Sequence, residues 1–120
     1  MSGSGKNARQ FSFKYREKLH LQSDFNAVFK KGIKFENRFI KIFAYKRQAG
    51  ALRRMGLVVS RKVGNAPQRN LAKRRLREIF RTNKNAFPAG IDIIFIPNSK
   101  TPKVKYKILK QAVLEMMSKL

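Results

Sequence analysis

The chain has no cysteine, no tryptophan and a single histidine, His20, among its 120 residues. Without cysteine it can form no disulfide and no thiolate metal site, which suits a reducing cytosol, so we expect a cytoplasmic location. A single histidine argues against a histidine-rich metal site and against a Ser–His hydrolase. The composition therefore gives little support to a hydrolytic or metal-dependent site carried by the protein itself.

Acidic residues are scarce as well. Six Asp and Glu stand against 29 Lys and Arg, which gives a formal net charge of +23 and a sequence pI of about 11.5. The acids are scattered, so the converging carboxylates of a two-metal nuclease are not expected, and Asp92 is expected to answer a nearby arginine. We predict no catalytic residue and no metal ligand in this chain. A charge this large repels itself unless a polyanion neutralises it, and nucleic acid is the commonest such partner.

Long apolar runs are also missing. No segment approaches the roughly 18 apolar residues of a membrane-spanning helix, and the N-terminus lacks the apolar centre of a secretory signal, so no membrane partner is expected. Since no enzyme active site emerges from the sequence, no small-molecule substrate is expected either. Hydrophobic residues still make up 42% of the chain, with 10 Phe and 3 Tyr, which is enough for one modest core. We predict a flexible basic arm over residues 1–18 and a single domain over residues 19–120.

The most informative segment is a basic helix expected after Gly64, where residues 64–81 read GNAPQRNLAKRRLREIFR. Asn65 suits the N-cap, and Pro67 suits the first turn. At about 100° per residue, an apolar stripe runs beside a basic face. The stripe consists of Ala72, Leu76, Ile79 and Phe80, and the basic face consists of Arg69, Asn70, Lys73, Arg74, Arg77 and Arg81. Forked guanidinium donors suit phosphate oxygens, and the one acid, Glu78, is expected on the far side, so polyanion binding is favoured over a merely solvated face.

The other periodicities predict further elements in a definite order. They are a helix over residues 24–31 capped by Ser23, strands over residues 38–46, 55–60 and 91–97, and a C-terminal helix capped by Thr101 with Pro102 at its first position. The order helix–strand–strand–helix–strand–helix, with an extra strand left open, predicts the α+β class and a small two-layer α/β sandwich. The third strand is apolar on both faces, so it should be buried at the centre of the sheet.

Three of these elements can converge on one trough in which aromatic rings face cations. The candidates are Phe25 and Phe29 on the short helix, Phe39, Lys41, Phe43 and Tyr45 on the outer side of the first strand, Lys62 in the basic loop, and Arg69, Lys73 and Arg77 on the basic helix. Bases stack on rings while cations follow the backbone, so single-stranded RNA is the favoured ligand. The alternative that these rings belong to the core stays open, above all for Phe25 and Phe29.

The segment Gly56–Arg81 resembles the signature of the bacterial ribonuclease P protein subunit. That signature is a strand ending in a basic turn, followed by a helix that opens with Arg-Asn-Arg and continues Lys-Arg-x-x-Arg-Glu. The residues that match it in register are Arg69, Asn70, Lys73, Arg74, Arg77 and Glu78. Leu71 stands where the family usually has arginine, so one contact to RNA is missing, and Arg74 or Arg75 could compensate. The stretches SDFNAVFKKG, NRFIKIF and DIIFIP extend the resemblance over roughly Leu19 to Leu120.

The resemblance implies a function that the composition alone only approaches. Such subunits join a large catalytic RNA that removes 5′ leaders from precursor tRNAs by magnesium-dependent hydrolysis, so the protein is a component of an endoribonuclease whose catalysis belongs to the RNA. The implied partners are that catalytic RNA and precursor tRNA, and the implied cofactor is Mg²⁺ used by the RNA. The family fold similarly implies an unusual left-handed βαβ crossover, against the general right-handed rule.

The resemblance also implies roles for individual residues. The contacts to the catalytic RNA would be Arg69, Asn70, Arg74 and Arg75, and the leader-binding cleft would be formed by Phe25, Phe29, Phe43, Lys62, Arg69, Lys73 and Arg77. The main alternative is a ribosomal or general RNA-packing protein, which shares the charge but needs no aromatic trough. A stand-alone magnesium nuclease is less favoured, as is a DNA-reading helix-turn-helix, because strands flank the basic helix.

Overall fold

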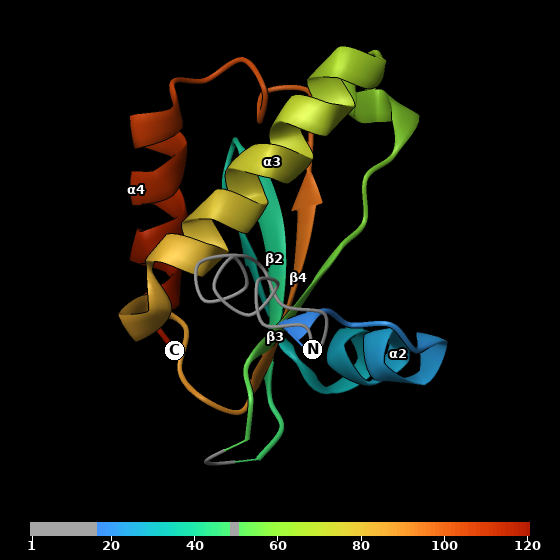
Figure 1. Cartoon of the computed structure of the whole chain (residues 1–120), viewed down its shortest axis with the longest axis vertical. Coiled ribbons are helices and arrows are strands. Elements are labelled where there is room, and N and C mark those ends of the chain that lie inside the picture. The colour runs from blue at the N-terminus through green and yellow to red at the C-terminus, as the bar shows by residue number, and fades with distance from the viewer. Residues whose placement is uncertain (1–16, 49–50) are drawn as a thin grey trace, which may run out of the picture.

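The computed structural model describes residues 17–48 and 51–120 and shows a four-stranded mixed sheet with helices packed against it (Figure 1). In chain order the elements are α2 (Gln22–Lys31), β1 (Ile33–Glu36), β2 (Ile40–Lys46), β3 (Arg54–Leu57), α3 (Ala66–Thr82), β4 (Ile91–Pro97) and α4 (Tyr106–Met117), with short 3-10 turns at Arg61–Val63 and Lys84–Ala86. The predicted α+β fold is confirmed, and β1 supplies the extra strand. The predicted arm lies outside the described residues, apart from residues 17 and 18.

Strand β4 lies inside the sheet, whose strand order is β1-β2-β4-β3. It pairs antiparallel with β2 and parallel with β3, and β2 pairs antiparallel with β1. All but one of its residues are buried, as predicted for a strand that is apolar on both faces. The parallel neighbours β3 and β4 are joined through α3, and the left-handedness of this crossover stays a prediction.

The alternation of side chains along β4 divides the apolar interior between the two faces of the sheet. Ile93 and Phe95 pack in the larger cluster with α3 and α4, whereas Ile94 packs with Val28 of α2 on the other face. The apolar stripe predicted for α3 is completely buried. Figure 1 shows α3 running diagonally across the sheet beside α4, with α2 standing apart from both. The basic helix and the helix that carries Phe25 therefore cover opposite faces.

Two predicted helix caps are wrong. Ser23 lies within α2, and the first turn of that helix has no side-chain cap. Thr101 does not begin α4, because its hydroxyl donates to the carbonyl of Phe39 at 2.5 Å and accepts from the N–H of Asn98 at 2.9 Å. The hydroxyl thus closes a turn against a distant strand, and α4 begins only after that turn.

Strand β3 also differs from the prediction of residues 55–60, because it begins one residue earlier and ends at Leu57. The N–H of Val58 still donates to the carbonyl of Phe95 at 3.0 Å, but the Ser60 hydroxyl then accepts from the N–H of Lys62 and turns the chain. Phe39 was expected on the same side as Phe43. It lies just before β2 and packs against the cluster on the α3 and α4 side instead.

Candidate nucleic-acid interface

Helix α3 begins at a reciprocal cap, which confirms the predicted N-cap. The side chain of Asn65 accepts from the N–H of Gln68 and the side chain of Gln68 accepts from the N–H of Asn65, each at 3.0 Å. Gly64 has a φ of 145°, and a Cβ at this position would collide with the Gln68 side chain. The Nη1 group of Arg69 also donates to the Gly64 carbonyl at 2.9 Å. The start of the basic helix is therefore held by several hydrogen bonds.

The basic face of α3 is largely open to solvent. Asn70, Arg74 and Arg77 are exposed and Lys73 is half-buried. Within residues 17–48 and 51–120, none of these four side chains forms a hydrogen bond or an ion pair. Arg81 at the end of the row differs, because its guanidinium binds Glu78 at 2.7 Å. The prediction that Glu78 lies on the far side of the helix from the basic face is therefore wrong. Among the described residues, the cations of this face without a protein partner are Lys73, Arg74 and Arg77, which lie in the middle of the helix.

Arg75, predicted to contact the catalytic RNA, also makes hydrogen bonds within the protein. Its Nη1 group donates to the carbonyls of Thr101, at 3.2 Å, and Val104, so it ties α3 to the turn before α4. Leu71, where the family usually has arginine, is half-buried. Of the two arginines expected to compensate for Leu71, only Arg74 is free of protein hydrogen bonds within the part of the chain that the structure describes.

The aromatic residues of α2 and β2 contact one another. The rings of Phe29 and Phe43 meet edge to face, with centroids 5.0 Å apart and an angle of 77° between their planes. Phe29 is 38% exposed, while Phe25 and Phe43 are partly buried against the cluster that contains Val28. These rings are thus neither fully buried in the core nor fully exposed, and they form a partly exposed apolar surface.

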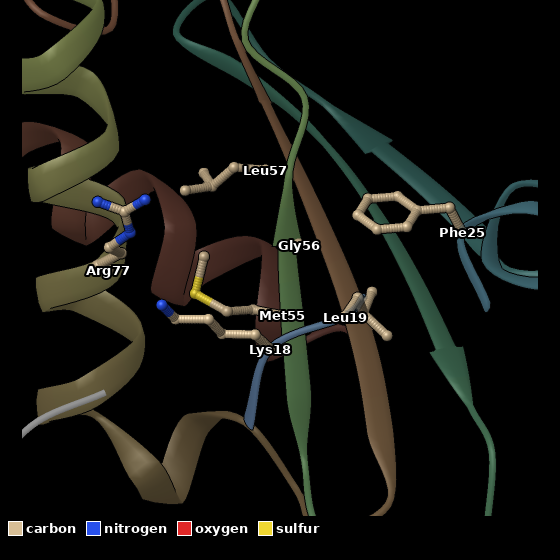
Figure 2. Close-up of a pocket in the computed structure, with 7 residues that line it drawn as sticks. All are labelled: Lys18, Leu19, Phe25, Met55, Gly56, Leu57 and Arg77. Carbon is tan, nitrogen blue, oxygen red and sulfur yellow. The ribbon is translucent and has the colours of Figure 1, made fainter. Parts of the chain in front are cut away.

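A pocket of about 190 Å³, which we call the β3 pocket, brings residues from both faces of the sheet together. It is lined by Lys18, Leu19, Phe25, Met55, Gly56, Leu57 and Arg77. Figure 2 shows Arg77 and Phe25 on opposite sides of β3, with Gly56 between them. A Cβ on Gly56 would lie 2.6 Å from Cζ of Phe25, so the glycine permits this approach. A ring and a cation predicted from different helices therefore share one pocket.

Only part of the predicted set of site residues meets at this pocket. Lys62 is exposed in the turn after β3, and Arg69 is held at the start of α3; neither they nor Lys73 lines the β3 pocket. Five lining residues were not predicted as site residues: Lys18, Leu19, Met55, Gly56 and Leu57. A glycine within a strand is a recognised sign of close approach, so Gly56 could have been found from the sequence. Lys18 gives no such signal.

Most of the acids take part in ion pairs within the protein. Asp92, only 2% exposed, binds Arg54 at 2.7 Å and Arg47 at 3.2 Å, which confirms the predicted arginine partner. Hydrogen bonding to Asp92 is the main cause that raises the pKa of Arg54 above its ordinary value. Glu17 lies 3.9 Å from Arg53, whose pKa is lowered by burial. Among the described residues, these acids leave Lys73, Arg74 and Arg77 of α3 without an acidic partner, so those three cations are available to an external anion.

Metal-ligand chemistry has little to build on among the described residues. In residues 17–48 and 51–120 no three His, Asp or Glu side chains gather closely enough to hold a metal ion, and Asp92 is already bound by arginines. Across the same residues, none of the helices has both the length and the apolar character needed to cross a membrane.

Comparison with known proteins identifies the family. The family model described as Ribonuclease P matches residues 13–120. The ribonuclease P protein component of Petrotoga mobilis is 40% identical over 114 residues, covering 91% of this chain and 95% of that protein. The corresponding component of Thermotoga maritima is 35% identical over 113 residues, covering 91% and 96%.

Solved structures agree with the sequence comparisons. The RNase P protein from Thermotoga maritima superposes with a TM-score of 0.76 at 36% identity, covering 88% of this chain and 98% of that chain. The RNase P protein of Staphylococcus aureus superposes with a TM-score of 0.71 at 31% identity, covering 86% and 93%. Together with the family model and the sequence relatives, the shared fold marks the chain as the protein component of a tRNA-processing ribonucleoprotein.

The chain belongs to the ribonuclease P protein family. It is the protein component of a holoenzyme that processes the 5′ ends of tRNA, so the expected family resemblance is confirmed. Membership implies a catalytic RNA as partner and precursor tRNA as substrate.

Proposed function

We propose that the protein binds the single-stranded 5′ leader of precursor tRNA at the β3 pocket, at the adjoining rings and at cations of α3 and of the turn before it that lie outside the pocket, and binds the catalytic RNA through α3. The leader contacts in this proposal are Phe25, Phe29, Phe43, Lys62, Arg69, Lys73 and Arg77. The contacts to the catalytic RNA are Arg69, Asn70, Arg74 and Arg75. Hydrolysis, and the Mg²⁺ it requires, belong to the RNA, and the complex acts in the cytoplasm.

The observation that carries the leader assignment is that Phe25 and Arg77 line one pocket. A base stacked on an aromatic ring contributes about 1–3 kcal/mol, and a guanidinium binds phosphate oxygens through charge-assisted hydrogen bonds. An extended strand crossing the edge of the sheet at Gly56 meets the ring on one side of β3 and the cation on the other. A double helix could not supply the unstacked base, so the arrangement favours a single-stranded ligand.

The unpaired cations of α3 supply the second part of the mechanism. Catalytic RNA and precursor tRNA are both polyanions, and their close approach normally requires counterions. Arg74 and Arg77 are exposed and free of protein partners within the described residues, so they can replace some of those counterions. By neutralising charge where the two RNAs meet, the protein lowers the magnesium concentration that the RNA needs.

Substitution of Arg77 tests the leader assignment in the reconstituted holoenzyme. We expect Arg77→Ala to weaken binding of precursor tRNA about tenfold, as for the loss of one hydrogen bond to a charged group, and to weaken binding of mature tRNA much less, through the lost charge alone. Arg81→Ala is the matched control, because it removes the same charge from the same helix but from a residue paired with Glu78. Equal losses for the two variants would contradict a specific role for Arg77.

A general RNA-packing protein remains the competing function, and the same assay separates the two. Such a protein needs charge but no aromatic pocket, so it would bind precursor and mature tRNA equally well. A clear preference for leader-bearing RNA that Phe25→Ala abolishes supports the proposal. Equal affinity for both RNAs in the unmodified holoenzyme would refute it.

A further inference from the structure

Strand β3 contacts α2 through two side-chain positions on the same face. Arg54 and Gly56 are two residues apart, so they point to the same side of the sheet. Nη1 of Arg54 binds Asp24 of α2 at 3.3 Å, and Gly56 lies against the ring of Phe25, the next residue of that helix. Consecutive residues of α2 are therefore held by alternate residues of β3.

The guanidinium of Arg54 is itself held in place by hydrogen bonds to Asp92 of β4. Its Nε and Nη2 groups bind the two oxygens of Asp92 at 2.9 and 2.7 Å, and Asp92 is 2% exposed. Nε of Arg47 reaches the same carboxylate at 3.2 Å. Asp92 thus orients Arg54 so that Nη1 is left for Asp24. This chain of ion pairs runs from the buried strand β4 through the edge strand to α2.

The Asp24–Arg54 ion pair connects α2 to the sheet through polar side chains. Among residues 17–48 and 51–120 it is the only side-chain ion pair or hydrogen bond that joins the two. The first turn of α2 has no side-chain cap, and apart from this link the helix is held by apolar contacts such as that of Val28. The end of α2 that carries Phe25 therefore depends on Asp24 for its placement.

We propose that Asp24 and Arg54 are positioning residues for leader binding. Their ion pair holds the first turn of α2 on β3 and so keeps the ring of Phe25 at the wall of the β3 pocket, where a base can stack. Neither residue lines that pocket. The inference rests on the proposed function, because it assumes that the leader occupies the β3 pocket.

Because Asp24 is negatively charged, its removal separates a positioning role from a simple effect of net charge on RNA binding. Asp24→Asn removes a negative charge from a protein of formal charge +23, so Coulomb attraction alone predicts tighter RNA binding. The positioning role predicts the opposite for leader-bearing RNA, since Phe25 loses its fixed orientation. Binding of mature tRNA, which has no leader, should not be weakened.

The test compares variants in the holoenzyme reconstituted with its catalytic RNA, using precursor and mature tRNA. We expect Asp24→Asn to weaken precursor binding about threefold to tenfold, part of the effect of losing one stacked base. Asp24→Glu, which keeps the carboxylate, should restore most of that binding. Glu115→Gln on α4 is the charge-matched control, because Glu115 is exposed and does not line the β3 pocket, and it should not weaken precursor binding.

The outcomes separate failure of this inference from failure of the proposed function. If Phe25→Ala weakens precursor binding but Asp24→Asn leaves it unchanged or raises it, the positioning role is overturned. Equal weakening of precursor and mature tRNA by Asp24→Asn would also overturn it, because it would show a general structural defect. If Phe25→Ala itself has no effect on precursor binding, the leader does not use this pocket and the proposed function fails first.

Discussion

The ring of Phe25 occupies the space that a side chain at Gly56 would need. A Cβ on Gly56 would lie 2.6 Å from Cζ and 2.7 Å from Cε1 of that ring, and 3.2 Å from Cδ1 of Leu19. We therefore expect Gly56→Ala to lower the free energy of unfolding by about 1–3 kcal/mol, as overpacking does, and to weaken binding of leader-bearing RNA. Urea unfolding and binding of precursor tRNA measure the two effects.

A double-mutant cycle shows whether the clash with the ring is the cause. In Gly56→Ala/Phe25→Leu the smaller side chain leaves space for the new methyl group. The double variant should therefore be more stable than the sum of the two single changes predicts. Strictly additive losses would show that the alanine disturbs the strand for another reason.

Arg75 and Arg74 are neighbours in sequence with different surroundings. Arg75→Ala leaves the carbonyls of Thr101 and Val104 without a donor, so we expect a loss of about 1–3 kcal/mol in the free energy of unfolding. Arg74→Ala removes an exposed side chain and should change stability little, while lowering affinity for the catalytic RNA. A thermal or urea unfolding series on both variants, paired with RNA binding at several salt concentrations, tests this division of roles.

Phe43 should contribute to RNA binding without contributing charge. Its loss removes the edge-to-face contact with Phe29 and, in our proposal, one stacking surface for a base. Phe43→Ala should weaken precursor binding but leave the slope of log K against log salt unchanged, whereas Lys73→Ala should reduce that slope by about one. A shallower slope for Phe43→Ala would mean that the ring acts through neighbouring cations.

Much of this fold could be predicted from local pattern. In α3 the helical spacing of the apolar residues is regular and Asn65 is a favourable N-cap residue, so the N-cap, the buried stripe and the exposed basic face were all predictable. The apolar character of residues 91–97 likewise gave the position of β4 inside the sheet. These features depend on residues close together in sequence, which is why a pattern reveals them.

One error arose where a distant partner decides the structure. Thr101 has the residue type and the following proline of a helix cap, but its hydroxyl is taken by the carbonyl of Phe39. The β3 pocket was only partly predictable for the same reason. The sequence places Phe25 and Arg77 in one cleft, but their position on either side of Gly56 depends on the edge position of β3, which no local pattern shows.

The position of β4 between β2 and β3 has a consequence for biosynthesis. The sheet cannot close until residues 91–97 have left the ribosome, although α3 is translated earlier. At about 5–20 residues per second, the nascent chain spends about 1–3 seconds between synthesis of Phe80 and completion of β4, and during that time Leu76 and Phe80 lack the central strand of the sheet that they later pack against. RNA can therefore meet this helix before the domain is complete, and assembly of the ribonucleoprotein competes in time with closure of the sheet.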